Sequence, residues 1–123
     1  MIERLEGFPD DVLAFSCHGH VTRDDYLATL VPAVERALTT HDCMRIYYEV
    51  ASDFEGIDPG AVLEDVKVGV ENLRRWERGA VVTDVPWIGH AVSLFGFLMP
   101  GELRVFPPAR REEARAWIRQ HDD

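Results

Sequence analysis

The fold is decided by residues 44–83, MRIYYEVASDFEGIDPGAVLEDVKVGVENLRRWERGAVVT, in which two strand-like runs enclose a helical pattern. Met44–Val50 is rich in aromatic and β-branched residues, which favour strands. Asp58 and Pro59 supply a capping carboxylate followed by a proline, a common start of a helix. Ala80–Thr83 is an apolar run without alternation, which is typical of a strand covered on both faces. The segment therefore predicts a strand–helix–strand unit, the building block of parallel α/β sheets.

The same alternation extends on both sides of this unit. The turn GFPDD at residues 7–11 joins the first two strands as a hairpin, so the first strand is predicted to be an antiparallel edge. Pro32 lies inside the first helix, where it removes a hydrogen bond and predicts a bend. The remaining predicted elements are strands at 2–5, 12–20 and 103–106, and helices at 22–40, 59–74, 86–99 and after Pro107–Pro108. We therefore expect an α/β fold of order β-β-α-β-α-β-α-β-α with a mainly parallel five-stranded sheet.

Length and charge narrow the class of protein. The chain has 123 residues, which is typical of one domain, so we expect a single domain over residues 1–123. Its 13 basic and 22 acidic residues give a formal charge of −9, which argues against a nucleic-acid binder. Cys17 and Cys43 form no Cys-x-x-Cys motif, and the N-terminus lacks the pattern of a signal peptide. We therefore expect a cytoplasmic protein with buried thiols.

The predicted helix at 86–99 is unusually apolar. From Val85 to Gly101 the only ionisable side chain is His90. Trp87–Met99 would extend about 20 Å, which is too short for the hydrocarbon core of a bilayer. The helix must therefore be covered by its own chain, by a second protomer or by a membrane surface, or act as a loose lid. A helical wheel predicts a sheet-facing side of Trp87, Ile88, Ala91, Leu94, Phe95, Leu98 and Met99, with Gly89, Ser93 and Gly96 opposite.

Two groups of polar residues are candidates for chemistry. His18 and His20 share one face of a predicted strand and His41 precedes Cys43, but no spacing signature ties these four into a metal site. We interpret the strand-end histidines as hydrogen-bonded and expect no metal.

Carboxylates near strand ends raise the alternative of an enzyme. A small hydrolase-like enzyme would use Glu49, Asp84 and His90. The chain shows no nucleophile paired with a base, no glycine-rich phosphate loop and no Gly-x-Ser-x-Gly elbow. We therefore expect no enzyme and no cofactor.

Four stretches resemble the SpoIIAA-like family of small bacterial proteins, which is related to STAS domains and has a lipid-carrier-like fold. They are GHVTRDDY (19–26), YYEVASDFEG (47–56), WERGAVVTDVPWIGHAV (76–92) and FGFLMPGELRVF (95–106), and the resemblance covers essentially the whole chain. It implies a compact α/β domain, a βα superhelix preceded by a short strand, that acts by binding and not by catalysis.

The resemblance also locates a regulatory position. Related anti-sigma-factor antagonists carry a phosphorylatable serine or threonine at the start of the helix after the third strand. The matching residues here are Asp58–Ala61, which hold no hydroxyl, and Ser52 comes too early. We interpret Asp58 as a helix N-cap, and a role as phosphate mimic is the alternative.

These observations together predict a non-enzymatic binding or regulatory module. Its working surface would be helix 86–99 with the loop 52–56. The expected partners are a small apolar ligand or lipid, a partner protein, a second copy in a homodimer, or a membrane surface contacted peripherally; nucleic acid is not expected. The predicted binding residues are Phe54, Trp87, His90, Ser93, Phe95 and Phe97.

Overall fold

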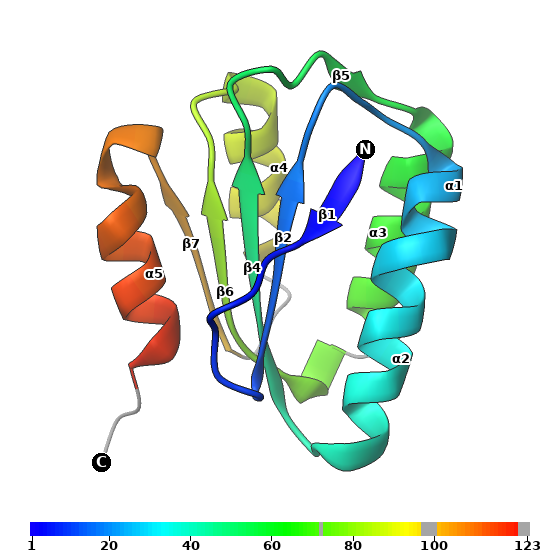
Figure 1. Ribbon diagram of the computed structural model, residues 1–123, viewed down its shortest axis with the longest axis vertical. Helices are drawn as coiled ribbons and strands as arrows, with labels where there is room; N and C mark the ends of the chain where they lie inside the picture. The colour runs from blue at the N-terminus through cyan, green and yellow to red at the C-terminus, as the bar shows by residue number, and fades with distance from the viewer. Residues whose placement is uncertain (72, 97–100, 121–123) are drawn as a thin grey trace.

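The apolar runs of the sequence assemble into one five-stranded sheet of order β1-β2-β4-β6-β7 (Figure 1). The computed structural model describes residues 1–71, 73–96 and 101–120, and only the backbone of residues 69, 70, 73 and 95. β1 pairs antiparallel with β2, and the other neighbours pair in parallel. The predicted α/β fold with an antiparallel N-terminal edge is confirmed. The strands are β1 (Ile2–Arg4), β2 (Val12–Cys17), β4 (Met44–Val50), β6 (Trp76–Val82) and β7 (Glu102–Phe106).

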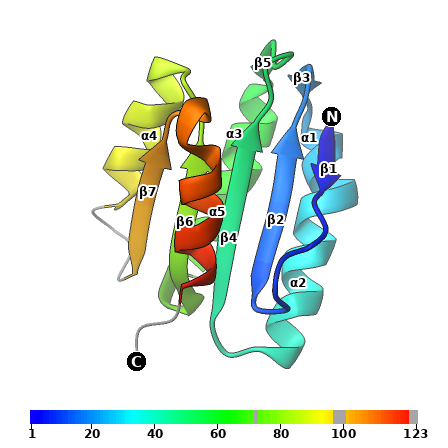
Figure 2. The same ribbon diagram turned by 60° about the vertical axis from the view of Figure 1, so that its left-hand side comes forward.

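Helices cover both faces of this sheet. α5 lies on one face, and α1, α2, α3 and α4 lie on the other (Figures 1 and 2). The α-helices are α1 (Arg23–Asp25), α2 (Val31–Thr40), α3 (Pro59–Glu71), α4 (Pro86–Gly96) and α5 (Arg111–Arg119). Three short helical turns complete the described chain: η1 (Tyr26–Leu30), η2 (Leu73–Arg75) and η3 (Pro108–Arg110).

The first helix begins where the sequence predicts and contains an irregular turn. The Thr22 hydroxyl accepts from the Asp25 backbone N–H at 3.2 Å, and the Asp25 carboxylate accepts from the Thr22 N–H at 2.8 Å, which together form a capping box. The irregularity lies before Pro32, where the Val31 N–H donates to the Tyr26 carbonyl and η1 is a π-helical turn. Tyr26, the first residue of this turn, is buried.

A second, two-stranded sheet is absent from the sequence prediction. β2 ends at Cys17, not at residue 20, because Gly19 with φ of 54° interrupts the strand. β3 (His20–Val21) then pairs in parallel with β5 (Gly56–Ile57). This pairing fixes the loop after β4 beside the start of α1.

The two faces of the sheet have separate apolar cores. On the face of α5, the core holds Val12, Ala14, Tyr47, Ala80, Val82, Phe106, Ala114 and Ile118. On the other face, it includes Leu13, Phe15, Cys17, Val21, Tyr26, Leu30, Val34 and Trp76. Of the two thiols, Cys17 is buried and Cys43 is exposed, so the prediction of two buried thiols is wrong for Cys43.

Two buried arginines hold the end of α5 against the sheet. Arg45 on β4 is 1% exposed and donates to the carbonyl oxygens of Ile118, at 3.0 Å, and of Gln120. Its guanidinium also pairs with Glu77 at 2.6 Å. Arg78 on β6 donates to the Gln120 carbonyl at 3.0 Å. Cations stabilise the C-terminal end of a helix, where unpaired carbonyls carry partial negative charge.

Candidate functional site

A cavity of about 220 Å³ lies between α3 and α4, on the face of the sheet opposite α5. Alternate residues of a strand point to the same face. Ile46, Tyr48 and Val50 of β4 therefore line the cavity, while Tyr47 belongs to the core under α5. The other strands contribute Cys17, Trp76, Val81 and Leu103, and the segment after β4 contributes Phe54 and Ile57.

α4 forms one wall of the cavity with Trp87, Ile88, Ala91 and Val92. None of its described side chains is fully buried. Leu94 is 71% exposed, whereas a Cβ atom on Gly96 would lie 3.8 Å from the Leu103 side chain of β7. The helical wheel placed these two residues the other way round, and that prediction is wrong. A helix with apolar residues on all sides gives the wheel too little contrast to fix its rotation.

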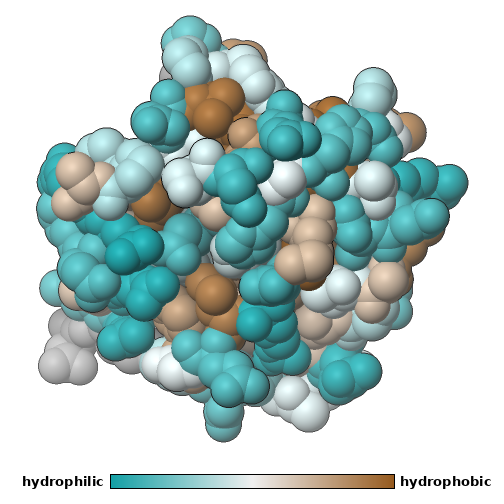
Figure 3. Space-filling model, turned by 45° about the horizontal axis from the view of Figure 1, so that its top comes forward, coloured by the Kyte–Doolittle hydropathy of each residue, from teal (hydrophilic) through white to brown (hydrophobic). Residues whose placement is uncertain are grey.

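Most of the exposed large hydrophobic side chains of the described residues lie on α3 and α4. The end at which the parallel strands finish is largely hydrophilic, with hydrophobic residues in separate patches (Figure 3). On α3 and α4, by contrast, Leu63 is 69% and Trp87 49% exposed. Within the described ranges, no helix is long and apolar enough to cross a bilayer.

Asp65 of α3 places a carboxylate in this otherwise apolar wall. The Tyr48 hydroxyl donates a hydrogen bond to Asp65 Oδ1 at 3.1 Å, and the Tyr26 hydroxyl also donates a hydrogen bond to the carboxylate. Burial raises the pKa of Asp65, and the hydrogen bonds from Tyr48 and Tyr26 oppose that rise.

The neighbouring titratable groups are neutral near pH 7. Burial, followed by the charge of Asp65, raises the pKa of Tyr26 and Tyr48 above the ordinary phenol value. The same two causes raise the pKa of the Cys17 thiol to about 12. Among the described residues that line the cavity, Asp65 is the one carboxylic acid, and it carries a charge above its raised pKa.

The raised pKa of Asp65 predicts a pH-dependent stability. The folded protein holds the Asp65 proton more tightly than the unfolded chain, so this group lowers the free energy of unfolding as pH rises from the ordinary aspartate range through the raised pKa. Asp65→Asn removes that loss. Urea denaturation over a pH series should show the variant gaining stability relative to the wild type as pH rises, and then a constant difference.

Asp25 provides a control of opposite sign. A backbone hydrogen bond from Thr22 is the largest cause that lowers the pKa of Asp25. Its stabilising contribution is therefore present above the ordinary aspartate range and lost as pH falls, so Asp25→Asn should lose stability relative to the wild type toward neutral pH. A pH-independent difference between Asp65→Asn and the wild type would contradict the assignment of a raised pKa to Asp65.

The predicted binding residues divide into three groups. Phe54 and Trp87 line the cavity. His90 and Ser93 are exposed on α4 and do not line it; the Ser93 hydroxyl donates to the Gly89 carbonyl at 3.0 Å. The Phe95 side chain and Phe97 lie outside what the structure describes.

The strand-end histidines contact carboxylates. His18 lies 3.1 Å from Asp53 Oδ1 and 2.7 Å from the Ser16 hydroxyl. His20 contacts the Asp58 carboxylate through Nε2. The interpretation of both as hydrogen-bonded histidines is confirmed. Over the described part of the chain, no three His, Cys, Asp or Glu side chains gather as a metal site.

Asp58 lies at the start of α3, as the sequence predicts. Its carbonyl oxygen accepts from the N–H groups of Ala61 and Val62, at 2.9 and 3.1 Å, so Asp58 occupies the capping position. Its carboxylate meets His20, which links α3 to β3. This contact gives Asp58 a structural partner.

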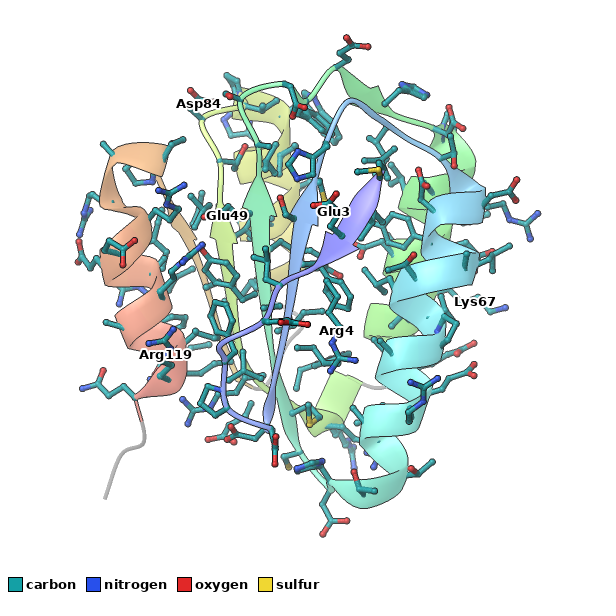
Figure 4. The ribbon with its side chains drawn as sticks, viewed as in Figure 1. Glu3, Arg4, Glu49, Lys67, Asp84 and Arg119 are labelled. Atoms are coloured by element: carbon teal, nitrogen blue, oxygen red, sulfur yellow. The ribbon has the colours of Figure 1, made fainter. Side chains whose placement is uncertain are left out.

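The three residues of the hydrolase alternative do not converge. Glu49 points to the α5 face, where it lies 3.3 Å from Arg115 and 3.4 Å from Arg111 (Figure 4). Asp84 lies beyond the carboxyl end of β6, and His90 is on α4, which covers the face of the sheet opposite α5 (Figure 2). Glu49 is thus engaged in ion pairs on the face away from α4. The arrangement offers no shared site for acid and base work.

Asp65 and its two tyrosines were not among the predicted site residues. A signal was present, because Asp65 lies one helical turn from both Ala61 and Val68, on a face of α3 that carries apolar side chains. A lone carboxylate in an apolar stripe is informative because it costs free energy unless it is partnered.

The chain resembles known proteins in sequence and in fold. Residues 12–119 match the family described as SpoIIAA-like. Among solved structures, the chain is similar to an uncharacterised protein of the DUF3478 family with a SpoIIAA-like fold from Shewanella loihica PV-4, with a TM-score of 0.72. The two share 24% identity, over 95% of this chain and 93% of that chain, which supports the fold. No curated protein matches.

Proposed function

This chain belongs to the SpoIIAA-like family, and we propose that it is a non-catalytic binding module whose ligand is a small, largely apolar molecule held between α3 and α4. The observation that supports this proposal most strongly is the cavity itself. Its lining is apolar apart from a few groups around Asp65, and both helices leave hydrophobic side chains exposed at its sides. Apolar cavities with a few polar groups are typical ligand sites.

The volume of the cavity sets the size of the ligand portion that it can enclose. An engineered protein cavity of about 150 Å³ holds benzene, so about 220 Å³ corresponds to about nine non-hydrogen atoms. A long acyl chain or a phospholipid exceeds this volume. The proposal therefore names a small molecule, and the predicted homodimer, partner protein and membrane contact stay predictions.

Titration calorimetry with 1-octanol tests the proposal. Burial of its chain contributes about 0.8 kcal/mol per methylene, so the expected dissociation constant is on the order of 10–100 µM at one site. Octanol has the size that the cavity admits, and it carries no charge. Failure to reach saturation at one molecule per chain would overturn the proposed function.

A further inference from the structure

The polar groups of the cavity gather at one place. Tyr48 comes from β4, Tyr26 from η1 and Asp65 from α3, so three separate elements bring two hydroxyls to one carboxylate. An ionised carboxylate accepts up to about four hydrogen bonds, and the two tyrosines supply two donors. Asp65 therefore keeps acceptor capacity for a donor inside the cavity.

The other residues that line the cavity favour a positively charged ligand over a negatively charged one. The described lining residues include no lysine, arginine or histidine, so a ligand carboxylate would find no cation there and would be repelled by an ionised Asp65. For a ligand ammonium, Asp65 would act as a counterion. Because folding has already removed Asp65 from water, binding does not add the cost of desolvating it. Opposite charges at hydrogen-bond distance form shorter and stronger bonds than neutral groups do.

We propose that Asp65 is a head-group subsite that makes the cavity select apolar molecules bearing a primary ammonium group, with neutral alcohols second and carboxylates rejected. This inference rests on the proposed function, because it assigns the polar end of the same cavity. The ammonium donates to the Asp65 carboxylate, and the alkyl chain lies against the apolar residues of β4, β6 and α4.

Three ligands with the same eight-carbon chain test the subsite. Octylamine, 1-octanol and nonanoate carry an ammonium, a hydroxyl and a carboxylate on the same octyl chain, so calorimetry above the raised pKa of Asp65 isolates the contribution of the head group. We expect octylamine to bind about tenfold more tightly than 1-octanol, because it gains a charge-assisted hydrogen bond. We expect nonanoate to bind about tenfold more weakly, because it is repelled by Asp65.

Two variants separate the subsite from the general negative charge of the protein. Asp65→Asn should abolish the roughly tenfold advantage of octylamine over 1-octanol when both ligands are measured on the same variant. Glu64→Gln removes the same charge from the neighbouring residue of α3, which pairs with Arg23 at 3.2 Å and does not line the cavity, so the order of the three ligands should persist.

The advantage of octylamine should also depend on pH. Tyr26, Tyr48 and Cys17 face Asp65 and stay neutral, so the titration of Asp65 governs the change. As pH falls through the raised pKa of Asp65, octylamine should lose its advantage while 1-octanol binding stays constant.

The outcomes distinguish this inference from the proposed function. If 1-octanol does not bind, the proposed function fails. If 1-octanol binds but octylamine is no tighter, or if octylamine keeps its advantage in Asp65→Asn, the ammonium subsite is overturned and the apolar cavity stands. If Asp65→Asn does not fold, the loss of the octylamine advantage as pH falls through the raised pKa of Asp65 still decides.

Discussion

Replacing Arg45 by methionine is expected to lower the free energy of unfolding by about 3 kcal/mol. The guanidinium is 1% exposed and donates to two carbonyls at the end of α5, those of Ile118 and Gln120. Each hydrogen bond from a charged donor contributes about 1.5–3 kcal/mol, and the carbonyls would be left without that donor. Urea denaturation measures the change directly.

Glu77→Gln separates the ion pair from the carbonyl contacts. Glu77 lies 2.6 Å from the Arg45 guanidinium, but its side chain is 47% exposed, so water screens the carboxylate end of the pair while the guanidinium keeps its carbonyl partners. The glutamine variant should therefore lose far less stability than Arg45→Met. Equal losses would contradict the assignment of Arg45 to the end of α5. Because α5 lies on the opposite face from the cavity, folded Arg45→Met should still bind 1-octanol normally.

Replacing Val66 by tryptophan is expected to abolish saturable binding of 1-octanol. Val66 is 46% exposed and lines the cavity at α3, so a larger side chain can occupy the ligand volume without displacing the buried core. With about nine non-hydrogen atoms of space in the wild type, an indole ring leaves no room for an eight-carbon chain. Calorimetry should show no saturation at one molecule per chain.

Lys67→Trp is the matched control. Lys67 is the next residue of the same helix, is exposed, and points away from the sheet (Figure 4). It does not line the cavity. The same bulky side chain at this position should leave the 1-octanol dissociation constant within about threefold. Loss of binding in Lys67→Trp but not in Val66→Trp would place the ligand on the outer surface of α3.

The sheet was predictable because its signals are local. Met44–Val50 and the hairpin turn at 7–11 carry strong strand and turn preferences, and the structure contains the strands that they predict. β6 begins at Trp76, earlier than the predicted start at residue 80. The prediction missed this start because Arg78 looks polar in the sequence, whereas in the structure it is buried and its guanidinium reaches the end of α5.

The site was less predictable because it depends on distant residues. The β3–β5 pair joins segments of two residues each, which carry no periodic pattern of their own. The apolar sequence of α4 indicated a functional surface, and the structure leaves this helix half-covered beside a cavity. Its rotation and the approach of Asp65 to Tyr26 and Tyr48 arise from tertiary packing, which one sequence does not reveal.

The most direct test of the account locates the ligand. Nuclear Overhauser effects between the chain protons of 1-octanol and the protein report contacts within a few ångströms. We predict effects to the methyl groups of Ile46, Val81 and Leu103, which lie under α3 and α4 at the floor of the cavity. Effects confined to Leu63 and Leu94 on the exposed surface would contradict the central claim that the ligand is held inside.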